Sequence, residues 1–221
     1  MKQRLVFLII LLVIIITQSG CFVFGVKTHL NWKNHPNYKR LYAHYHIKHE
    51  QELFLDTSFG IQMRKFYKKN KEQLHDHIQP VQYLLFNKEG RLVSYIVNCY
   101  IPTNILLIPR WGKGKNFDTF PTKTFVPIDS GFTLADFSKL VKDTSGNNLV
   151  IPPPSYDYIE LVVFNSALYR VSRSLIKVVK HQDKKGYMVK TFFIDSDNSF
   201  VFDQSDSTAK RKIRELILSH N

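Results

Sequence analysis

Cysteine is scarce in this chain: Cys21 and Cys99 are the two cysteines among 221 residues. A small exported domain that depended on disulfides would carry more of them, in even number, so a disulfide scaffold is excluded. Long disordered stretches are not expected either, because 17 Phe and 11 Tyr supply more apolar surface than a chain can leave in water. The composition indicates a globular domain with a real core.

Acidic residues are also in short supply, with 18 Asp and Glu against 31 Lys and Arg. Removing Lys2 and Arg4, which lie in the leader, leaves 29 basic against 18 acidic residues after residue 20, a net charge of +11. Such an excess favours anionic partners such as phosphate head groups, acidic glycans or nucleic acid. A lysine-rich surface that only keeps the protein soluble has the same composition.

The N-terminus has the pattern of a secretory signal peptide. Met1 to Arg4 is short and basic, Leu5 to Ile16 is a run of twelve apolar residues, and small residues lead up to Cys21. Ser19-Gly20-Cys21 resembles the lipobox of bacterial lipoproteins, in which the leader is cut before the cysteine. The resemblance implies that residues 1–20 are removed and that Cys21 carries acyl chains such as palmitate. It also implies that Phe22, next to the cysteine, is compatible with delivery to the outer membrane rather than the inner one.

An uncleaved membrane anchor is the alternative. The twelve-residue apolar run is too short for a hydrocarbon core, which needs about 20 residues, but Phe22 to Val26 could extend it. Gln18 also departs from the apolar residue that is usual in a lipobox. Lys2 and Arg4 would then keep the N-terminus in the cytoplasm. Both interpretations place residues 27–221 outside the cytoplasm, at the bacterial cell envelope, which disfavours nucleic acid as a partner.

After the leader we expect a membrane tether over residues 21–43 and a single α/β domain over residues 44–221. Pro152-Pro153-Pro154 separates its two parts, a helix with a β-rich half over 44–150 and an α/β half over 151–221. In the first part, one amphipathic helix of about five turns is predicted by apolar residues at helical spacing. These residues are Phe59, Met63, Phe66, Tyr67, Leu74 and Ile78.

The rest of the first part predicts strands and one short helix. Residues 81–87 and 91–100 flank Lys88-Glu89-Gly90 and read as a hairpin, with Ile105–Ile108 as another short strand. Side chains alternate along a strand, so the second hairpin strand should carry Cys99 in an apolar row with Val93, Tyr95 and Val97. Cys99 is then expected to be a buried hydrophobe. Residues 133–141 predict a helix capped by Thr133 with Asp136 three residues on.

The second part predicts a strand, a crossover helix and a second, parallel strand. Ile159–Phe164 and Met188–Ile194 are apolar runs, and Leu168, Val171, Leu175 and Val178 lie between them at helical spacing. Ala209, Ile213, Leu216 and Ile217 predict a final helix. Residues 155–200 resemble the central βαβ unit of the thioredoxin fold, with Asn165–Tyr169 at the loop that carries two cysteines in that family. No cysteine occupies this loop, and thiol–disulfide exchange by the usual route needs two sulfur atoms.

Two sets of side chains have metal-ligand chemistry. His44, His46, His49 and Glu50, with His75 and His77 further on, offer imidazole and carboxylate ligands for zinc, although their spacing matches no known zinc motif. Asp195, Asp197, Ser199, Asp203 and Asp206 stand at the intervals of a calcium loop, but Phe200 occupies the position of the required glycine. Exposed histidines beside lysines are common, and an acidic turn that ends a strand and caps the last helix accounts better for the second pattern. No metal or other cofactor is therefore expected.

Three further sequence features have the residue types of a catalytic or anion-binding site. Ser166 lies at a strand-to-helix turn, yet it lacks the flanking glycines of a hydrolase elbow, and no catalytic residue is assigned. Gly112-Lys113-Gly114-Lys115 does not have the residue spacing of a phosphate-binding loop, so a basic turn is predicted there. Arg170, Arg173, Lys177 and Lys180 are spaced 3, 4 and 3 apart, so they form one stripe of the predicted helix. This stripe is the candidate anion-binding site.

The sequence therefore predicts a membrane-anchored envelope lipoprotein that acts as a non-catalytic binding module. Its expected partners are the membrane, through the N-terminal lipid, and an anionic lipid or an envelope protein. An enzyme is the alternative, either a diverged thioredoxin-like oxidoreductase that uses Cys99 or a metal-dependent enzyme that uses the histidines.

Overall fold

A computed structural model describes residues 40, 42–47, 52–68, 71–101, 110–114, 116–124, 131–151, 155–205, 207–208 and 211. Several sequence features lie outside this part of the chain. They are the leader with Cys21, most of the tether, His49 and Glu50, the predicted strand Ile105–Ile108, the three prolines, Asp206, and nearly all of the predicted final helix.

The core is one six-stranded mixed sheet with the order β3-β2-β5-β6-β1-β4. Its strands are β1 (Leu53–Leu55), β2 (Gln82–Asn87), β3 (Leu92–Val97), β4 (Val141–Asp143), β5 (Tyr158–Phe164) and β6 (Val189–Asp195). β5, β6 and β1 run parallel to one another, while β2, β3 and β4 pair antiparallel to their neighbours. This mixed sheet, together with its helices, confirms the predicted α/β class.

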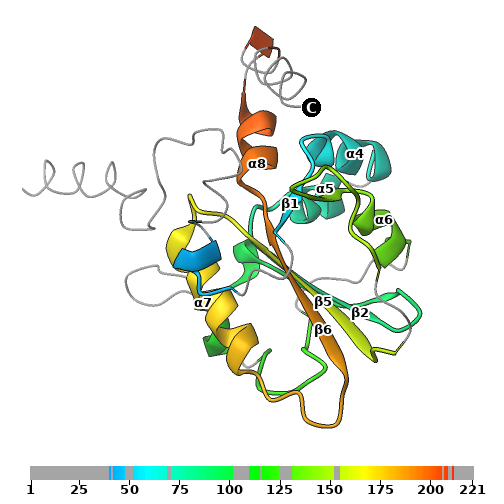
Figure 1. The fold of residues 1–221 in the computed structure, drawn as a ribbon, viewed down its shortest axis with the longest axis vertical. Helices are drawn as coiled ribbons and strands as arrows, with labels where there is room; N and C mark the ends of the chain where they lie inside the picture. The colour runs from blue at the N-terminus through cyan, green and yellow to red at the C-terminus, as the bar shows by residue number, and fades with distance from the viewer. Residues whose placement is uncertain are drawn as a thin grey trace, which may run out of the picture.

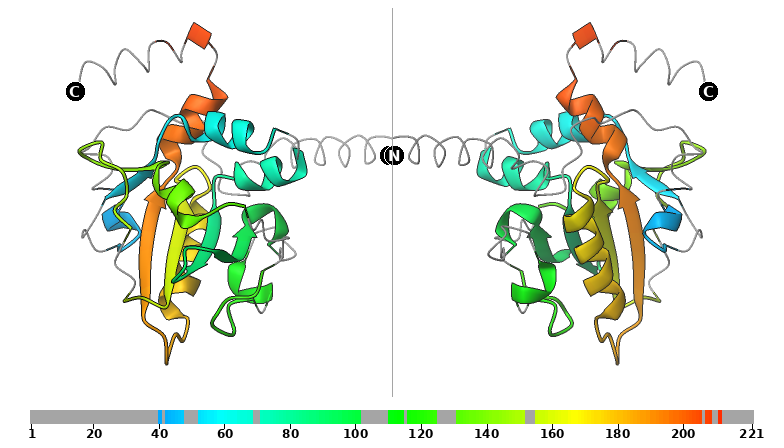
Figure 2. Two further views of the ribbon diagram at one scale, coloured as in Figure 1. Left: turned by 90° about the vertical axis from the view of Figure 1, so that its right-hand side faces the viewer. Right: turned by 90° about the vertical axis from the view of Figure 1, so that its left-hand side faces the viewer.

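Helices cover both faces of the sheet. α7 (Tyr169–His181) lies on one face, and α4 (Phe59–Phe66), α5 (Lys71–His77) and α6 (Leu134–Ser138) lie on the other (Figures 1 and 2). α8 (Asp197–Gln204) follows β6 at the end of the sheet, and the short 3₁₀ helices η1 and η2 span Asn98–Tyr100 and Trp111–Gly114. Each face has its own apolar cluster, since alternate residues of β5 point to opposite sides: Leu161 and Val163 to one, Val162 and Phe164 to the other.

The predicted βαβ unit is confirmed. β5 and β6 pair in parallel from Tyr158↔Val189 to Phe164↔Asp195, and α7 connects them. β5 is buried along almost its whole length, as its apolar run predicts. On α7, Val171 and Leu175 are buried against the sheet as predicted, whereas Leu168 and Val178 are only partly buried and Val179 takes the inner position of the last turn.

The hairpin is also confirmed, but the side-chain pattern of its second strand is not the predicted one. β2 and β3 pair antiparallel, with a register shift that leaves Val93 without a partner between Leu92 and Ser94. An extra residue of this kind reverses the alternation. Val93 therefore packs against the α7-side cluster, whereas Tyr95 and Val97 belong to the opposite cluster.

The predicted burial of Cys99 is wrong. β3 ends at Val97, and Cys99 lies in η1 with an exposed side chain. The apolar row stops because the chain turns at Asn98 instead of continuing as a strand. Partial burial, together with the charge of Asp76, raises the pKa of the Cys99 thiol. A raised thiol pKa lowers the fraction of reactive thiolate at neutral pH.

The single five-turn helix is wrong as well, because α4 ends at Phe66 and α5 begins at Lys71. The apolar spacing is kept on both sides of the break: Met63 and Tyr67 are buried, and Leu74 and Ile78 pack against the same cluster. Phe66 is 48% exposed although the pattern placed it on the inner face. Periodicity alone could not locate the break, since lysines and Asn70 occupy it without a glycine or proline signal.

The predicted cap of α6 is confirmed as a full capping box. The Thr133 hydroxyl accepts a hydrogen bond from the Asp136 N–H (3.2 Å), and the Asp136 carboxylate accepts from the Thr133 N–H (3.2 Å). The helix is shorter than predicted, because Leu140 lies in a turn and Val141 begins β4.

The segment before β1 is attached to the middle of the sheet. The hydroxyl of the buried Tyr42 lies 2.7 Å from the Leu53 carbonyl and 2.8 Å from the Phe193 carbonyl, and it accepts from the Leu53 N–H (2.9 Å). Tyr45 packs against Phe164 and Tyr169. These contacts bind residues 42–45 to the α7 side of the domain.

Candidate functional site

The parallel strands β1, β5 and β6 all end at the same edge of the sheet. Asp56, Asn165 and Asp195–Asp197 stand at or just after these ends, as the register of the three strands requires. In open α/β sheets the carboxyl ends of parallel strands are the usual position of ligands. A ligand site is therefore expected at this edge.

A buried group of polar residues fills most of this edge, and we call it the carboxyl-edge cluster. The Ser166 N–H donates to Asp197 Oδ1 (2.6 Å), and the Asp197 N–H donates to Asp195 Oδ1 (2.7 Å). The Asn165 side-chain amide donates to the Ser196 hydroxyl (3.1 Å), and the Ser172 hydroxyl donates to the Asn165 carbonyl (2.8 Å). These six residues are all buried.

The carboxyl-edge cluster explains two sequence features. Ser166 stands at the predicted strand-to-helix turn, but it is buried and its backbone is held by Asp197. The acidic residues with calcium-loop spacing point in different directions, because Asp197–Gln204 is the helix α8. Asp195 and Asp197 point into the cluster, whereas Asp203 reaches Arg64 of α4. The spacing therefore does not produce a calcium loop.

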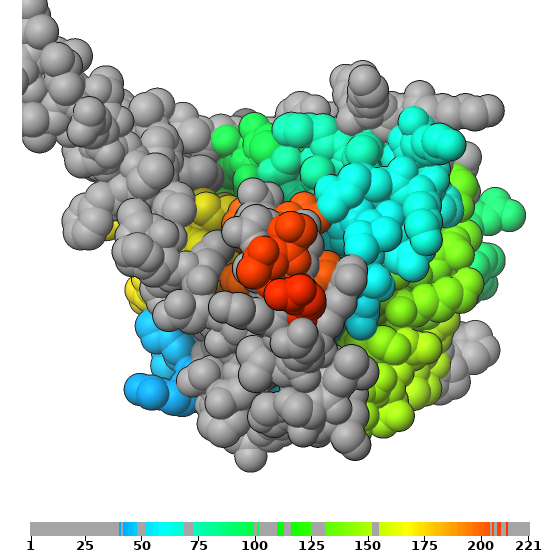
Figure 3. Space-filling view, turned by 90° about the horizontal axis from the view of Figure 1, so that it is seen from above, coloured from blue at the N-terminus to red at the C-terminus, as the bar shows by residue number. Residues whose placement is uncertain are grey.

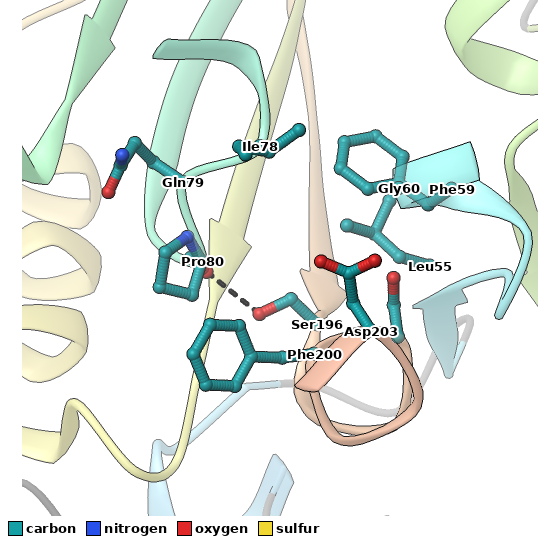
Figure 4. Close-up of a pocket in the computed structure, with 10 residues that line it drawn as sticks. Leu55, Phe59, Gly60, Ile78, Gln79, Pro80, Ser196, Phe200 and Asp203 are labelled. Carbon is teal, nitrogen blue, oxygen red and sulfur yellow. Dashed lines mark hydrogen bonds between the residues drawn. The ribbon is translucent and has the colours of Figure 1, made fainter. Parts of the chain in front are cut away.

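A hollow of about 170 Å³ lies beside the carboxyl-edge cluster, between α4, α8 and the residues that precede β2, and we call it the α4–α8 hollow. Figure 3 shows α8 (orange) next to α4 (cyan) at this end of the molecule, and Figure 4 shows the hollow itself. Most of its wall is apolar, with Ser196, Ser199, Gln79 and Asp203 as polar groups. The apolar lining comes from Leu55, Phe59, Gly60, Ile78, Pro80 and Phe200.

Contacts between α4, α8 and the residues before β2 hold the walls of the hollow together. The Ser196 hydroxyl donates to the Pro80 carbonyl (2.8 Å), the contact drawn in Figure 4. Asp203 forms an ion pair with Arg64, which joins α8 to α4. A Cβ at Gly60 would lie 2.7 Å from Asp203 Oδ1, closer than real Cβ contacts. A side chain at position 60 would therefore have to displace the Asp203 carboxylate from its place beside Arg64.

A second polar group lies near the starts of β5 and β6, and we call it the Glu160 cluster. Glu160 is fully buried, and its carboxylate accepts from the Tyr83 hydroxyl (2.9 Å), the Thr191 hydroxyl (2.6 Å) and the Lys184 ammonium (2.5 Å). Burial, together with the charge of Glu160, raises the pKa of Tyr83 well above its usual value. Glu160 was missed by sequence reasoning, although one charged residue inside an apolar strand was an available signal.

The histidines of the two predicted metal-ligand groups lie on opposite faces of the sheet. The His44 ring packs against Tyr45 and Tyr169 on the α7 side. His77 is buried on the other side, stacked between Tyr67 (4.6 Å between ring centroids) and Tyr95 (4.4 Å). Among the residues that the structure describes, no group of three His, Cys, Asp or Glu side chains is placed to hold a metal ion.

The four predicted anion-binding residues are exposed on α7. Lys180 differs from Arg170, Arg173 and Lys177, since its ammonium group donates to the backbone carbonyls of Tyr45 and His46. Partial burial lowers the pKa of Lys180. Three cations of the stripe thus lie on the outer side of the helix, while the fourth holds the N-terminal segment. The predicted basic turn at Gly112 packs against Val178 of the same helix.

Comparisons with models of protein families, with curated proteins and with solved structures found no match for this chain. Within the described residues, no helix is both long enough and apolar enough to cross a bilayer.

Proposed function

We propose that the protein is an exported lipoprotein of the bacterial envelope, anchored through Cys21, and that its α/β domain is a non-catalytic binding module. The α4–α8 hollow is the observation that carries the binding role. It lies at the carboxyl edge of the parallel strands, where ligands of α/β sheets are usually bound. The leader and the cysteine that follows it support the anchor.

The size of the α4–α8 hollow favours a side chain of a partner protein over a cofactor. Pockets for cofactors and drug-sized ligands enclose about 300–1,000 Å³. The volume of about 170 Å³ is instead close to that of apolar cavities that accept a benzene ring. An aromatic or branched aliphatic side chain would contact Phe59, Ile78 and Phe200. Asp203 and Gln79 could then hydrogen-bond to the backbone that flanks it.

A thioredoxin-like origin of residues 155–200 is part of this proposal. It is supported by the β5-α7-β6 unit, whose loop Asn165–Tyr169 leads into α7 at the position where that family carries its cysteines. In this chain the loop makes hydrogen bonds within the carboxyl-edge cluster. The position that performs redox chemistry in the family would serve here to fix the edge of the sheet beside the hollow.

Site-specific photocrosslinking in cells tests the binding role. The photoreactive residue benzoylphenylalanine replaces Phe200, which lines the hollow, or Phe66, which is exposed on α4 and does not line it. We expect a discrete crosslinked envelope protein from position 200 and none from position 66. Equal products from both positions, or none from position 200, would contradict binding in the hollow.

Labelling with a radioactive fatty acid tests the anchor separately. Wild-type protein should incorporate the label, and the Cys21→Ala variant should not. Equal labelling of the two proteins would contradict lipidation at Cys21.

A further inference from the structure

Two segments far apart in the sequence form one basic surface, with the exposed Asp118 and Asp183 near the C-terminal end of α7. The segments are residues 40–47 and α7, and neither contains Asp or Glu. Figure 1 shows the N-terminal segment (blue) lying across α7 (yellow). The two segments are in contact, since the His44 ring lies 4.9 Å from the Tyr169 ring. Arg40, Arg170, Arg173 and Lys177 are exposed on this surface, which we call the α7 face.

The α7 face is also where the N-terminal part of the chain joins the domain. Tyr42 is bonded to β1 and β6, and Lys180 holds the carbonyls of Tyr45 and His46. Arg40 is the first residue that the structure describes, and the chain before it leads back to the proposed anchor at Cys21. The opposite face, covered by α4, α5 and α6, carries acidic as well as basic residues, including Asp136 beside Lys139.

We propose that the α7 face docks on the anionic lipid head groups of the membrane to which the N-terminus attaches the protein. This inference rests on the proposed membrane attachment. Basic residues near a membrane surface are attracted to anionic lipid within about one Debye length, which is roughly 8–10 Å in physiological salt. The anchor raises the local concentration of the domain at the surface, so a modest attraction is sufficient to orient it.

The experiment uses the full-length protein reconstituted through its own N-terminus into vesicles of phosphatidylglycerol and phosphatidylcholine. A fluorophore is placed on Ser174→Cys in α7 or, as a matched control, on Gln62→Cys in α4, both in a Cys99→Ser background. A nitroxide on the lipid head groups quenches fluorophores that lie at the surface. We expect strong quenching at position 174 and weak quenching at position 62. The difference should vanish in pure phosphatidylcholine and in high salt.

Two charge-reversal variants with equal net charge distinguish docking of the α7 face from non-specific attraction of the whole basic domain to anionic lipid. Arg170→Glu, Arg173→Glu and Lys177→Glu together should abolish quenching at position 174, since three favourable contacts correspond to roughly 100-fold in the docking equilibrium. Reversal of Lys65, Lys68 and Arg91, which are exposed on the opposite side, should leave it unchanged. Equal effects of the two triple variants, or quenching that persists in pure phosphatidylcholine, would overturn the proposal.

Flotation of the same vesicles measures attachment independently of orientation. Protein that fails to float contradicts the proposed membrane attachment and, with it, docking of the α7 face. Protein that floats in both lipid mixtures but shows no quenching at position 174 contradicts only the docking.

Discussion

The carboxyl-edge cluster and the Glu160 cluster lie at opposite ends of β5 and β6, and their buried carboxylates are balanced in different ways. Glu160 is paired with a cation, since Lys184 reaches it from the turn before β6. Asp195 and Asp197 accept hydrogen bonds from backbone N–H groups instead, at 2.7 and 2.6 Å. The backbone donors are fixed by the fold, whereas the lysine must be immobilised at a cost in side-chain entropy.

Two carboxylates elsewhere in the domain are more exposed, and they also differ in the kind of partner that they have. Asp203 pairs with the cation Arg64, whose side chain is 44% exposed. Asp136 accepts hydrogen bonds from the hydroxyl and N–H of Thr133 in the capping box of α6. These buried and exposed carboxylates allow the effect of burial to be compared with the effect of the partner, although Asp136 also lies 3.5 Å from the exposed Lys139 ammonium.

The largest effect is expected at Glu160. Lys184→Met should lower the free energy of unfolding by about 3 kcal/mol, because it leaves a fully buried carboxylate without its cation. The double variant Lys184→Met, Glu160→Gln should recover much of the loss, since no charge is then left unpaired. Urea denaturation measures both. A loss below about 1 kcal/mol for Lys184→Met would mean that the hydrogen bonds from Tyr83 and Thr191 are enough to stabilise the buried Glu160 carboxylate.

A smaller loss is expected in the carboxyl-edge cluster. Asp197→Ala should cost about 2 kcal/mol, because the buried Ser166 N–H loses its acceptor. Asp197→Asn retains an oxygen at the same position and should cost about 1 kcal/mol or less. Denaturant unfolding of the two variants side by side gives the comparison. If Asn costs as much as Ala, the negative charge matters more than the hydrogen bond, and the contrast with Glu160 disappears.

The capping box should contribute about 1 kcal/mol, and this contribution should depend on pH. The hydrogen bond from the Thr133 hydroxyl is the main cause that lowers the pKa of Asp136. A carboxyl whose pKa is lowered by folding adds stability above its unfolded pKa of about 3.9, and that stability is lost as the pH falls through the folded pKa. The melting temperatures of wild type and Thr133→Ala should therefore differ more at pH 7 than in acid, where the hydrogen bond from the Asp136 N–H to the Thr133 hydroxyl still separates them. A difference that is constant with pH would contradict this origin.

The smallest effect is expected for the exposed ion pair. Arg64→Met should change the free energy of unfolding by about 0.5 kcal/mol or less, because solvent screens a pair of this kind. The effect should also shrink in high salt, which the loss at Lys184 should not do. Chemical denaturation at low and high salt measures this, and a loss as large as that of Lys184→Met would show that burial is not what separates the two ion pairs.

The elements that the sequence predicted correctly are those whose signals are local. The two β-rich runs and the glycine of the hairpin, the Thr133–Asp136 spacing, and the two apolar strands around α7 are each recognised from residues close together in the chain. Local patterns determine which side of an element is apolar. They therefore predicted the class of the fold and part of the inner face of α7.

The features that the sequence did not predict depend on contacts between distant segments. Ser166 and Asp197 are 31 residues apart, and so are Glu160 and Thr191, and parallel pairing of β5 with β6 brings them together. The α4–α8 hollow likewise brings Gly60 and Asp203 together, which no local pattern of either residue indicates. Cys99 was misplaced for a different reason, because the chain turns after Val97 and the strand ends three residues before the predicted end at Tyr100.

The hydrogen bonds of Tyr42 and Lys180 also determine how the domain would respond to mechanical load. A force applied to the chain before Tyr42 would not act first on an edge strand, which could be peeled away one hydrogen bond at a time. It acts on residues that are bonded to β1 and β6, two inner strands, and to α7. A pull on the N-terminal segment would therefore load the interior of the sheet and α7 before it reached an edge strand.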